Sequence, residues 1–103
     1  MPPRIPGSRT DTDVAVIARR PARLDCEPTG VPEPNITWYK DGGVMDGEGS
    51  LLVRVLRGGR VLQVVAAEPE HAGVYSCVAK NVAGQDRRRF NLAVQGEWQH
   101  WYG

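Results

Sequence analysis

The two cysteines of this chain, Cys26 and Cys77, constrain its fold more than any other feature of the sequence. Trp38 follows the first cysteine by twelve residues, and Tyr75 precedes the second by two. Apolar and polar residues alternate around each of these positions, which is typical of a β-strand with one face in a core. All four side chains are therefore predicted to lie on the inward faces of strands.

The spacing of these four residues resembles that of an immunoglobulin sandwich. The segment from Cys77 to Gly84 has the C-x-A-x-N-x-x-G pattern of the I-set subgroup, and Trp38-Tyr39-Lys40-Asp41-Gly42 matches its strand C. The resemblance implies an all-β, Greek-key fold of two antiparallel sheets, joined by one disulfide between Cys26 and Cys77. It also implies that Trp38 covers the disulfide and that the Tyr75 hydroxyl bonds to backbone upstream.

Two further segments resemble the tandem immunoglobulin repeats of hemicentins, which are giant extracellular-matrix proteins. They are Pro2-Pro3-Arg4-Ile5 and residues 54–64, and the likeness covers residues 2 to 95. It implies a non-enzymatic module of a secreted multidomain matrix or adhesion protein, serving as a rigid spacer and as a protein-binding surface. Its expected partners are neighbouring immunoglobulin repeats and matrix or cell-surface proteins. A domain of a cell-surface receptor ectodomain is the alternative.

The length of 103 residues suits one domain, since immunoglobulin domains run to about 100 residues. We assign residues 1–3 to an N-terminal linker or expression remnant, residues 4–95 to the immunoglobulin domain, and residues 96–103 to a C-terminal linker or tail. The chain is therefore expected to be a domain excised from a longer protein. In the tail, the spacing of Trp98 and Trp101 resembles the start of a thrombospondin type-1 repeat.

An extracellular location is expected from the cysteines and from one sequon. A disulfide persists in an oxidising compartment, whereas two reduced, packed cysteines, as in intracellular muscle domains of this family, are the alternative. Asn35-Ile36-Thr37 is an N-glycosylation sequon, and alternation turns Asn35 and Thr37 toward solvent. No apolar run approaches the roughly 20 residues that cross a bilayer, so no membrane insertion is expected.

The composition argues against several other functions. Thirteen basic and twelve acidic residues give a net charge of +1, so no global field attracts nucleic acid. Two histidines, no spare cysteine and no serine in a triad context leave no basis for an enzyme or a cofactor. Acidic residues such as Asp11 and Asp13 lack the spacing of a calcium loop, so no metal site is predicted.

Period-two alternation predicts seven or eight short strands in two sheets. An edge strand over Arg4–Gly7 is expected to continue at residues 13–18, and strand D to span about residues 51–56. Arg57-Gly58-Gly59-Arg60 predicts a two-residue hairpin centred on its glycines. The residues expected to face the core are Val14, Val16, Ala22, Leu24, Cys26, Ile36, Trp38, Leu62, Val64, Ala66, Tyr75, Cys77, Ala79, Phe90, Leu92 and Val94.

His71 stands where immunoglobulin domains usually carry an aspartate that pairs with an arginine. We expect that pair to be lost and the partner arginine, Arg54 or Arg57, to find Glu68 or Glu70 instead. A modest loss of stability is the favoured consequence, and pH sensing by His71 is the alternative.

The outward side of the sheet formed by strands C, F and G is the predicted binding face. Tyrosine and arginine are common interface hot spots, and an exposed Val78 is expected to add apolar area. Alternation turns Arg87 and Arg89 outward and puts Arg88 on the side of Phe90. The run Arg87-Arg88-Arg89 also suits sulfate groups, so heparan sulfate is a second candidate ligand, while protection of an edge strand needs no ligand. With Thr37, the candidate contact residues are Tyr39, Val78, Lys80, Arg87, Arg89 and Asn91.

Overall fold

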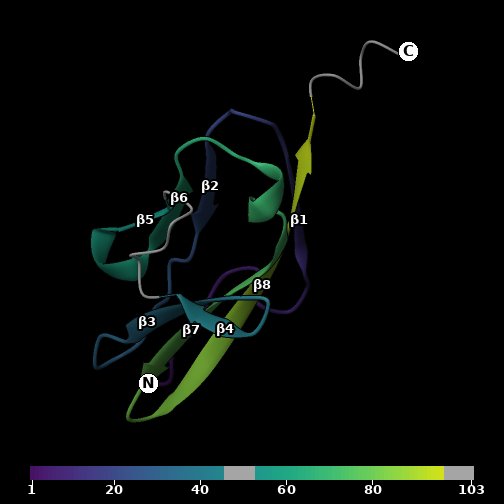
Figure 1. Ribbon diagram of the computed structural model, residues 1–103. Helices are drawn as coiled ribbons and strands as arrows, with labels where there is room; N and C mark the ends of the chain where they lie inside the picture. Colours follow the sequence, from purple (N-terminus) through teal and green to yellow (C-terminus); the bar gives the residue numbers. More distant parts are fainter. Residues whose placement is uncertain (46–52, 97–103) are drawn as a thin grey trace.

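The computed structural model describes residues 1–45 and 53–96, which form eight strands (Figure 1). The strands are β1 (Thr12–Ile17), β2 (Ala22–Asp25), β3 (Asn35–Lys40), β4 (Gly43–Met45), β5 (Val53–Leu56), β6 (Val61–Val64), β7 (Gly73–Asn81) and β8 (Gly84–Gln95). Two short 3-10 turns, η1 (Arg57–Gly59) and η2 (Pro69–His71), join them. The start of predicted strand D and the tail with Trp98 and Trp101 lie outside the described residues. Within the described ranges no helix has the length and hydropathy of a membrane span.

The strands form the two predicted sheets, ordered β1-β8-β7-β3-β4 and β2-β6-β5 (Figure 1). All pairings are antiparallel except that of β1 with β8, which is parallel, so the five-stranded sheet is mixed. The predicted edge strand at Arg4–Gly7 is wrong, because this segment makes only an isolated bridge between Arg4 and Thr29. Pro6 has no N–H to donate and Gly7 has φ +86°, so the chain turns here and pairs only from Thr12 onward.

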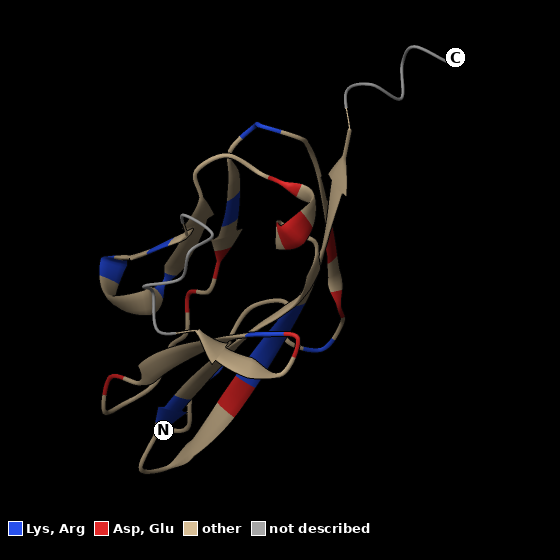
Figure 2. Ribbon diagram, in the orientation of Figure 1, with Lys and Arg blue, Asp and Glu red and all other residues tan. Residues whose placement is uncertain are grey.

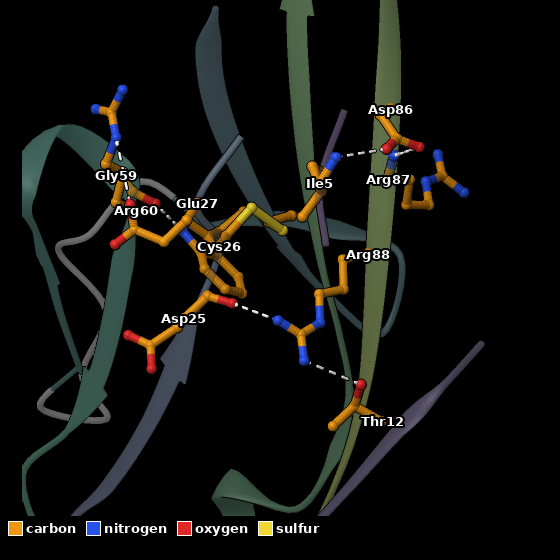
Figure 3. The surroundings of a disulfide bond; sticks show 12 residues. Ile5, Thr12, Asp25, Cys26, Glu27, Gly59, Arg60, Asp86, Arg87 and Arg88 are labelled. Carbon is orange, nitrogen blue, oxygen red and sulfur yellow. Dashed lines mark hydrogen bonds and ion pairs between the residues drawn. A yellow bond between two sulfur atoms is a disulfide. The ribbon is translucent and has the colours of Figure 1, made fainter. Parts of the chain in front are cut away.

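The disulfide joins the two sheets, as the resemblance implied (Figure 3). Cys26 directly follows β2 in the three-stranded sheet, and Cys77 lies on β7 in the five-stranded sheet, directly opposite Trp38. Leu62 and the other predicted core residues are buried or pack against the core, with one exception. Ala66 is only half-buried, because β6 ends at Val64 and the following bend turns Ala67 inward instead.

The link between β5 and β6 is longer than the predicted two-residue hairpin. Leu56 pairs with Val61, so four residues, 57–60, connect the strands. Gly59 supplies a carbonyl to the buried Trp38 indole N–H at 2.7 Å, and the Arg60 carbonyl accepts from the Cys26 N–H at 2.7 Å. The longer loop is therefore favoured because it satisfies two buried donors beside the disulfide.

Candidate functional site

The candidate site lies on the outer face of the five-stranded sheet. Strand pairing aligns its side chains in rows that run across β3, β7 and β8. Tyr39, Ser76 and Arg89 form one row. Thr37, Val78 and Arg87 form the next row toward the β7–β8 turn, with the same outward parity.

A hollow in this face brings together four of the seven predicted contact residues. Thr37, Val78 and Lys80 are not part of its wall. The side chains of Arg87 and Arg89 are exposed, and within the described residues neither guanidinium is engaged in a hydrogen bond or an ion pair. The hollow is lined by Asp11, Tyr39, Asp41, Gly42, Val74, Ser76, Arg87, Arg89 and Asn91.

The expectation of an exposed Val78 is wrong, since this residue is only 9% exposed. It does point outward, but it lies on the central strand β7 between Thr37 and Arg87, and neighbours on both sides cover it. The exposed apolar side chains near the hollow are instead Val44, which pairs with Tyr39, and Val74. Alternation gives the direction of a side chain but not how far its neighbours shield it.

Asp41 forms the acidic edge of the hollow, although it was not among the contact residues predicted from the sequence. Its backbone has φ +50°, and its Oδ1 accepts from the Val74 N–H at 3.0 Å while Oδ2 accepts from Lys40 Nζ at 2.8 Å. The Lys40 hydrogen bond is the main reason that the pKa of Asp41 is lowered, and the Val74 N–H adds to it. The carboxylate is therefore held ionised and oriented beside the site.

Arg88 turns away from this face and into the space between the sheets (Figure 3). Its Nη1 donates to the Asp25 carbonyl at 3.0 Å, and its Nη2 donates to Thr12 Oγ1 at 3.2 Å. The guanidinium also stacks over the Phe90 ring at 4.6 Å, on the side that alternation predicted. Only two of the three consecutive arginines are thus available to a ligand of the outer face.

Asn35 lies at one end of the same face, at the start of β3 and opposite Lys80. Asn35 and Thr37 are both exposed, as the alternation predicted. Attachment of a glycan to Asn35 stays a prediction.

His71, which stands where these domains usually carry an aspartate, takes part in the cap of the 3-10 turn η2. It is buried, and its Nδ1 accepts from the Glu68 N–H at 2.8 Å. The expectation that Arg57 pairs with Glu68 or Glu70 is wrong, because the loop after β5 places Arg57 beside Glu27 at 3.4 Å. The His71 carbonyl accepts from the Tyr75 hydroxyl at 2.5 Å, which confirms the predicted bond to upstream backbone.

Stability is expected to fall above pH 10 because of Tyr75. Burial raises the pKa of this phenol to about 12, and the nearby charge of Asp41 contributes. An unfolded tyrosine titrates near 10, so the contribution is fully present below about pH 10 and is lost as pH rises through the folded pKa. We expect a loss of roughly 2 kcal/mol, measured by urea unfolding between pH 8 and 12. A Tyr75→Phe variant with the same pH profile would assign the loss to another group.

The sequence and the structure of this chain are similar to those of several known proteins. The immunoglobulin domain family model matches residues 2–81. Hemicentin-1 of Mus musculus is 42% identical over 94 residues, which is 90% of this chain and 2% of the relative. Neuronal cell adhesion molecule of Rattus norvegicus is 37% identical over 97 residues, 91% of this chain and 8% of the relative. The structure of titin domains z1z2 in complex with telethonin superposes with a TM-score of 0.80 at 30% identity, covering 94% of this chain and 48% of that one.

Proposed function

This chain belongs to the immunoglobulin domain family, and from that premise we propose that it is one non-enzymatic module of a long extracellular matrix or adhesion protein. The similar segments of hemicentin-1 and neuronal cell adhesion molecule support this setting, because the chain spans only 2% and 8% of those proteins. A receptor ectodomain is the alternative setting. The parent sequence on either side of the chain distinguishes the two.

The first proposed role is that of a rigid spacer. The disulfide fixes the two sheets to each other, and further bonds attach the N-terminal segment to the sandwich. The Ile5 N–H donates to Asp86 Oδ2 at 2.7 Å, and Asn81 Nδ2 donates to the Met1 carbonyl at 2.9 Å. A module whose entering segment is held in this way transmits orientation along a chain of repeats.

The second proposed role is protein recognition by the outer face of the five-stranded sheet. The observation that carries it is the hollow, in which Tyr39 lies near two arginines that have no partner among the described residues. Tyrosine and arginine contribute more binding free energy than most residues when a partner covers them. Tyrosine buries a large side chain, and arginine forms charge-assisted hydrogen bonds to the partner. Arg23, on the opposite face, is already paired with Asp25 at 2.9 Å.

Substitution in the hollow is expected to weaken binding to a protein partner. Tyr39→Ala and Arg89→Ala should each cost more than about 1 kcal/mol, measured by calorimetry or surface plasmon resonance. Arg23→Ala is the matched control and should have little effect. If Arg23→Ala weakens binding and the other two do not, the partner contacts the three-stranded sheet and the assignment is wrong.

Heparan sulfate is the weaker candidate ligand for this face. Lys80, Arg87 and Arg89 are exposed on it, which favours a polyanion. However, the Arg88 side chain is hydrogen-bonded between the sheets. In addition, the acidic residues Asp11 and Asp41 line the hollow together with Arg87 and Arg89. A uniformly anionic chain would therefore meet repulsion where a protein surface of mixed charge would not.

A further inference from the structure

A small residue between two large ones shapes the hollow on the outer face of the five-stranded sheet. Ser76 lies on the central strand β7, with Tyr39 opposite it on β3 and Arg89 opposite it on β8. All three residues line the hollow, and the serine side chain is much shorter than its two neighbours. Each of the three also carries a hydrogen-bond donor. The hollow therefore suits a group that accepts hydrogen bonds.

The charges around the hollow do not cancel. Arg87 and Arg89 line it, and Figure 2 shows this basic stretch of β8 beside the turn between β3 and β4. In that turn the Asp41 carboxylate is already paired with Lys40 Nζ at 2.8 Å. Asp11 also lines the hollow and has no ion pair within the described residues. Two cations thus face a single free carboxylate, which leaves the hollow with one positive charge in excess.

The two arginines are spaced so that both can reach the same group. Arg87 and Arg89 are two residues apart on β8, so their side chains leave the same face of the sheet about 7 Å apart. Both side chains are long and exposed, and neither guanidinium has a partner within the described residues. A guanidinium binds a carboxylate through two parallel N–H···O bonds, which makes a carboxylate the matching acceptor.

We propose that the hollow receives one acidic side chain, an aspartate or a glutamate, from a loop of a partner protein. The inference rests on the proposed recognition role and names the residue type that anchors the partner. The carboxylate accepts hydrogen bonds from the Arg87 and Arg89 guanidiniums. The hydroxyl groups of Ser76 and Tyr39 supply further donors in the same hollow. One carboxylate brings the charge of the hollow to zero, so the anchor needs no neighbouring acid.

The single excess charge distinguishes this occupant from two others. A polyanion such as heparan sulfate brings further negative charges against Asp11, and like charges repel. An uncharged loop displaces solvent from the two guanidiniums and gives them no acceptor of matching charge, which costs free energy. A loop with one acidic residue avoids both costs.

The test is selection from a phage-displayed library of short peptide loops closed by a disulfide. Loops that bind the unglycosylated parent chain are kept, and those that also bind Arg87→Gln/Arg89→Gln are removed, so that the remaining loops recognise the hollow. We expect each remaining loop to carry one aspartate or glutamate. Replacing that acid by its amide in a synthetic loop should weaken binding about tenfold, measured by calorimetry.

The neighbouring acids Asp11 and Asp13 offer a matched pair of variants. Asp11 lines the hollow, whereas Asp13 does not and accepts from Asn91 Nδ2 at 3.0 Å. Asp11→Asn removes the one free carboxylate that opposes the anchor, so the selected loop should bind about threefold more tightly. Asp13→Asn makes the same change in net charge and should alter binding much less.

Arg20→Gln/Arg54→Gln is the control for the arginine variant, since it removes the same charge away from the face and should leave loop binding intact. Circular dichroism establishes that each variant is folded. Selection that yields no loop, loops without an acid, or loops with runs of acids overturns the single acidic anchor, and the last result assigns the hollow to a polyanion. If the anchor is wrong while Tyr39→Ala and Arg89→Ala still weaken binding to a partner protein, the recognition role stands.

Discussion

Removal of the disulfide by a Cys26→Ala/Cys77→Ala substitution is expected to lower the free energy of unfolding by about 2–5 kcal/mol. The bond closes a loop with a sequence separation of 51, and loss of that constraint on the unfolded chain accounts for about 4 kcal/mol in the chain-entropy model. Both sulfurs are buried at the centre of the core, so alanine also leaves unfilled space. Urea unfolding of the parent and the variant at neutral pH measures the difference.

Intact mass with and without reductant is the control for the state of the cysteines. A parent protein refolded under oxidising conditions should gain two mass units on reduction, one for each thiol formed. Two free thiols in that protein would contradict the bond and revive the alternative of reduced cysteines in an intracellular setting. Equal stability of parent and variant would contradict its energetic role.

The sequence predicted the core well because alternation reports a local property of each strand. Leu24, Trp38, Cys77 and Phe90 are buried where the period-two pattern placed them. The resemblance to an immunoglobulin sandwich, carried by the spacing of the cysteines, tryptophan and tyrosine, then implied which strands face one another. It also implied the disulfide between the sheets and the bond from Tyr75 to upstream backbone, and the structure confirms both.

The candidate site was less predictable because its properties depend on contacts between distant segments. Alternation turned Val78 outward but gave no information on the strands that flank it. It put Arg88 on the inner side, yet the hydrogen bonds to Asp25 and Thr12 come from segments more than sixty residues away, as the separations of 63 and 76 show. The carboxylate of Asp41 is likewise oriented by Val74, which is 33 residues away.

The adjacent glycines Gly58 and Gly59 illustrate the same limit. Both have positive φ, at 69° and 98°, as a turn centred on Gly-Gly requires. The sequence alone does not distinguish the roles of the two glycines, because a two-residue hairpin and the observed four-residue loop use the same residues. Only the packing distinguishes these glycines, since Gly59 approaches Ile36 on β3 whereas Gly58 faces open surroundings near Arg60.

Gly59→Ala is therefore expected to lower the free energy of unfolding by roughly 2–4 kcal/mol, well beyond the effect of Gly58→Ala. A Cβ at position 59 would lie 2.9 Å from Ile36 Cβ, which forces this loop away from the Trp38 indole that it caps. At position 58 the nearest atom is the Arg60 Nη1 at 3.5 Å, an ordinary contact, so only the positive φ costs about 1 kcal/mol. Urea unfolding of both variants measures the difference. Equal losses would contradict the four-residue loop, because in a two-residue hairpin both glycines are needed only for their backbone angles.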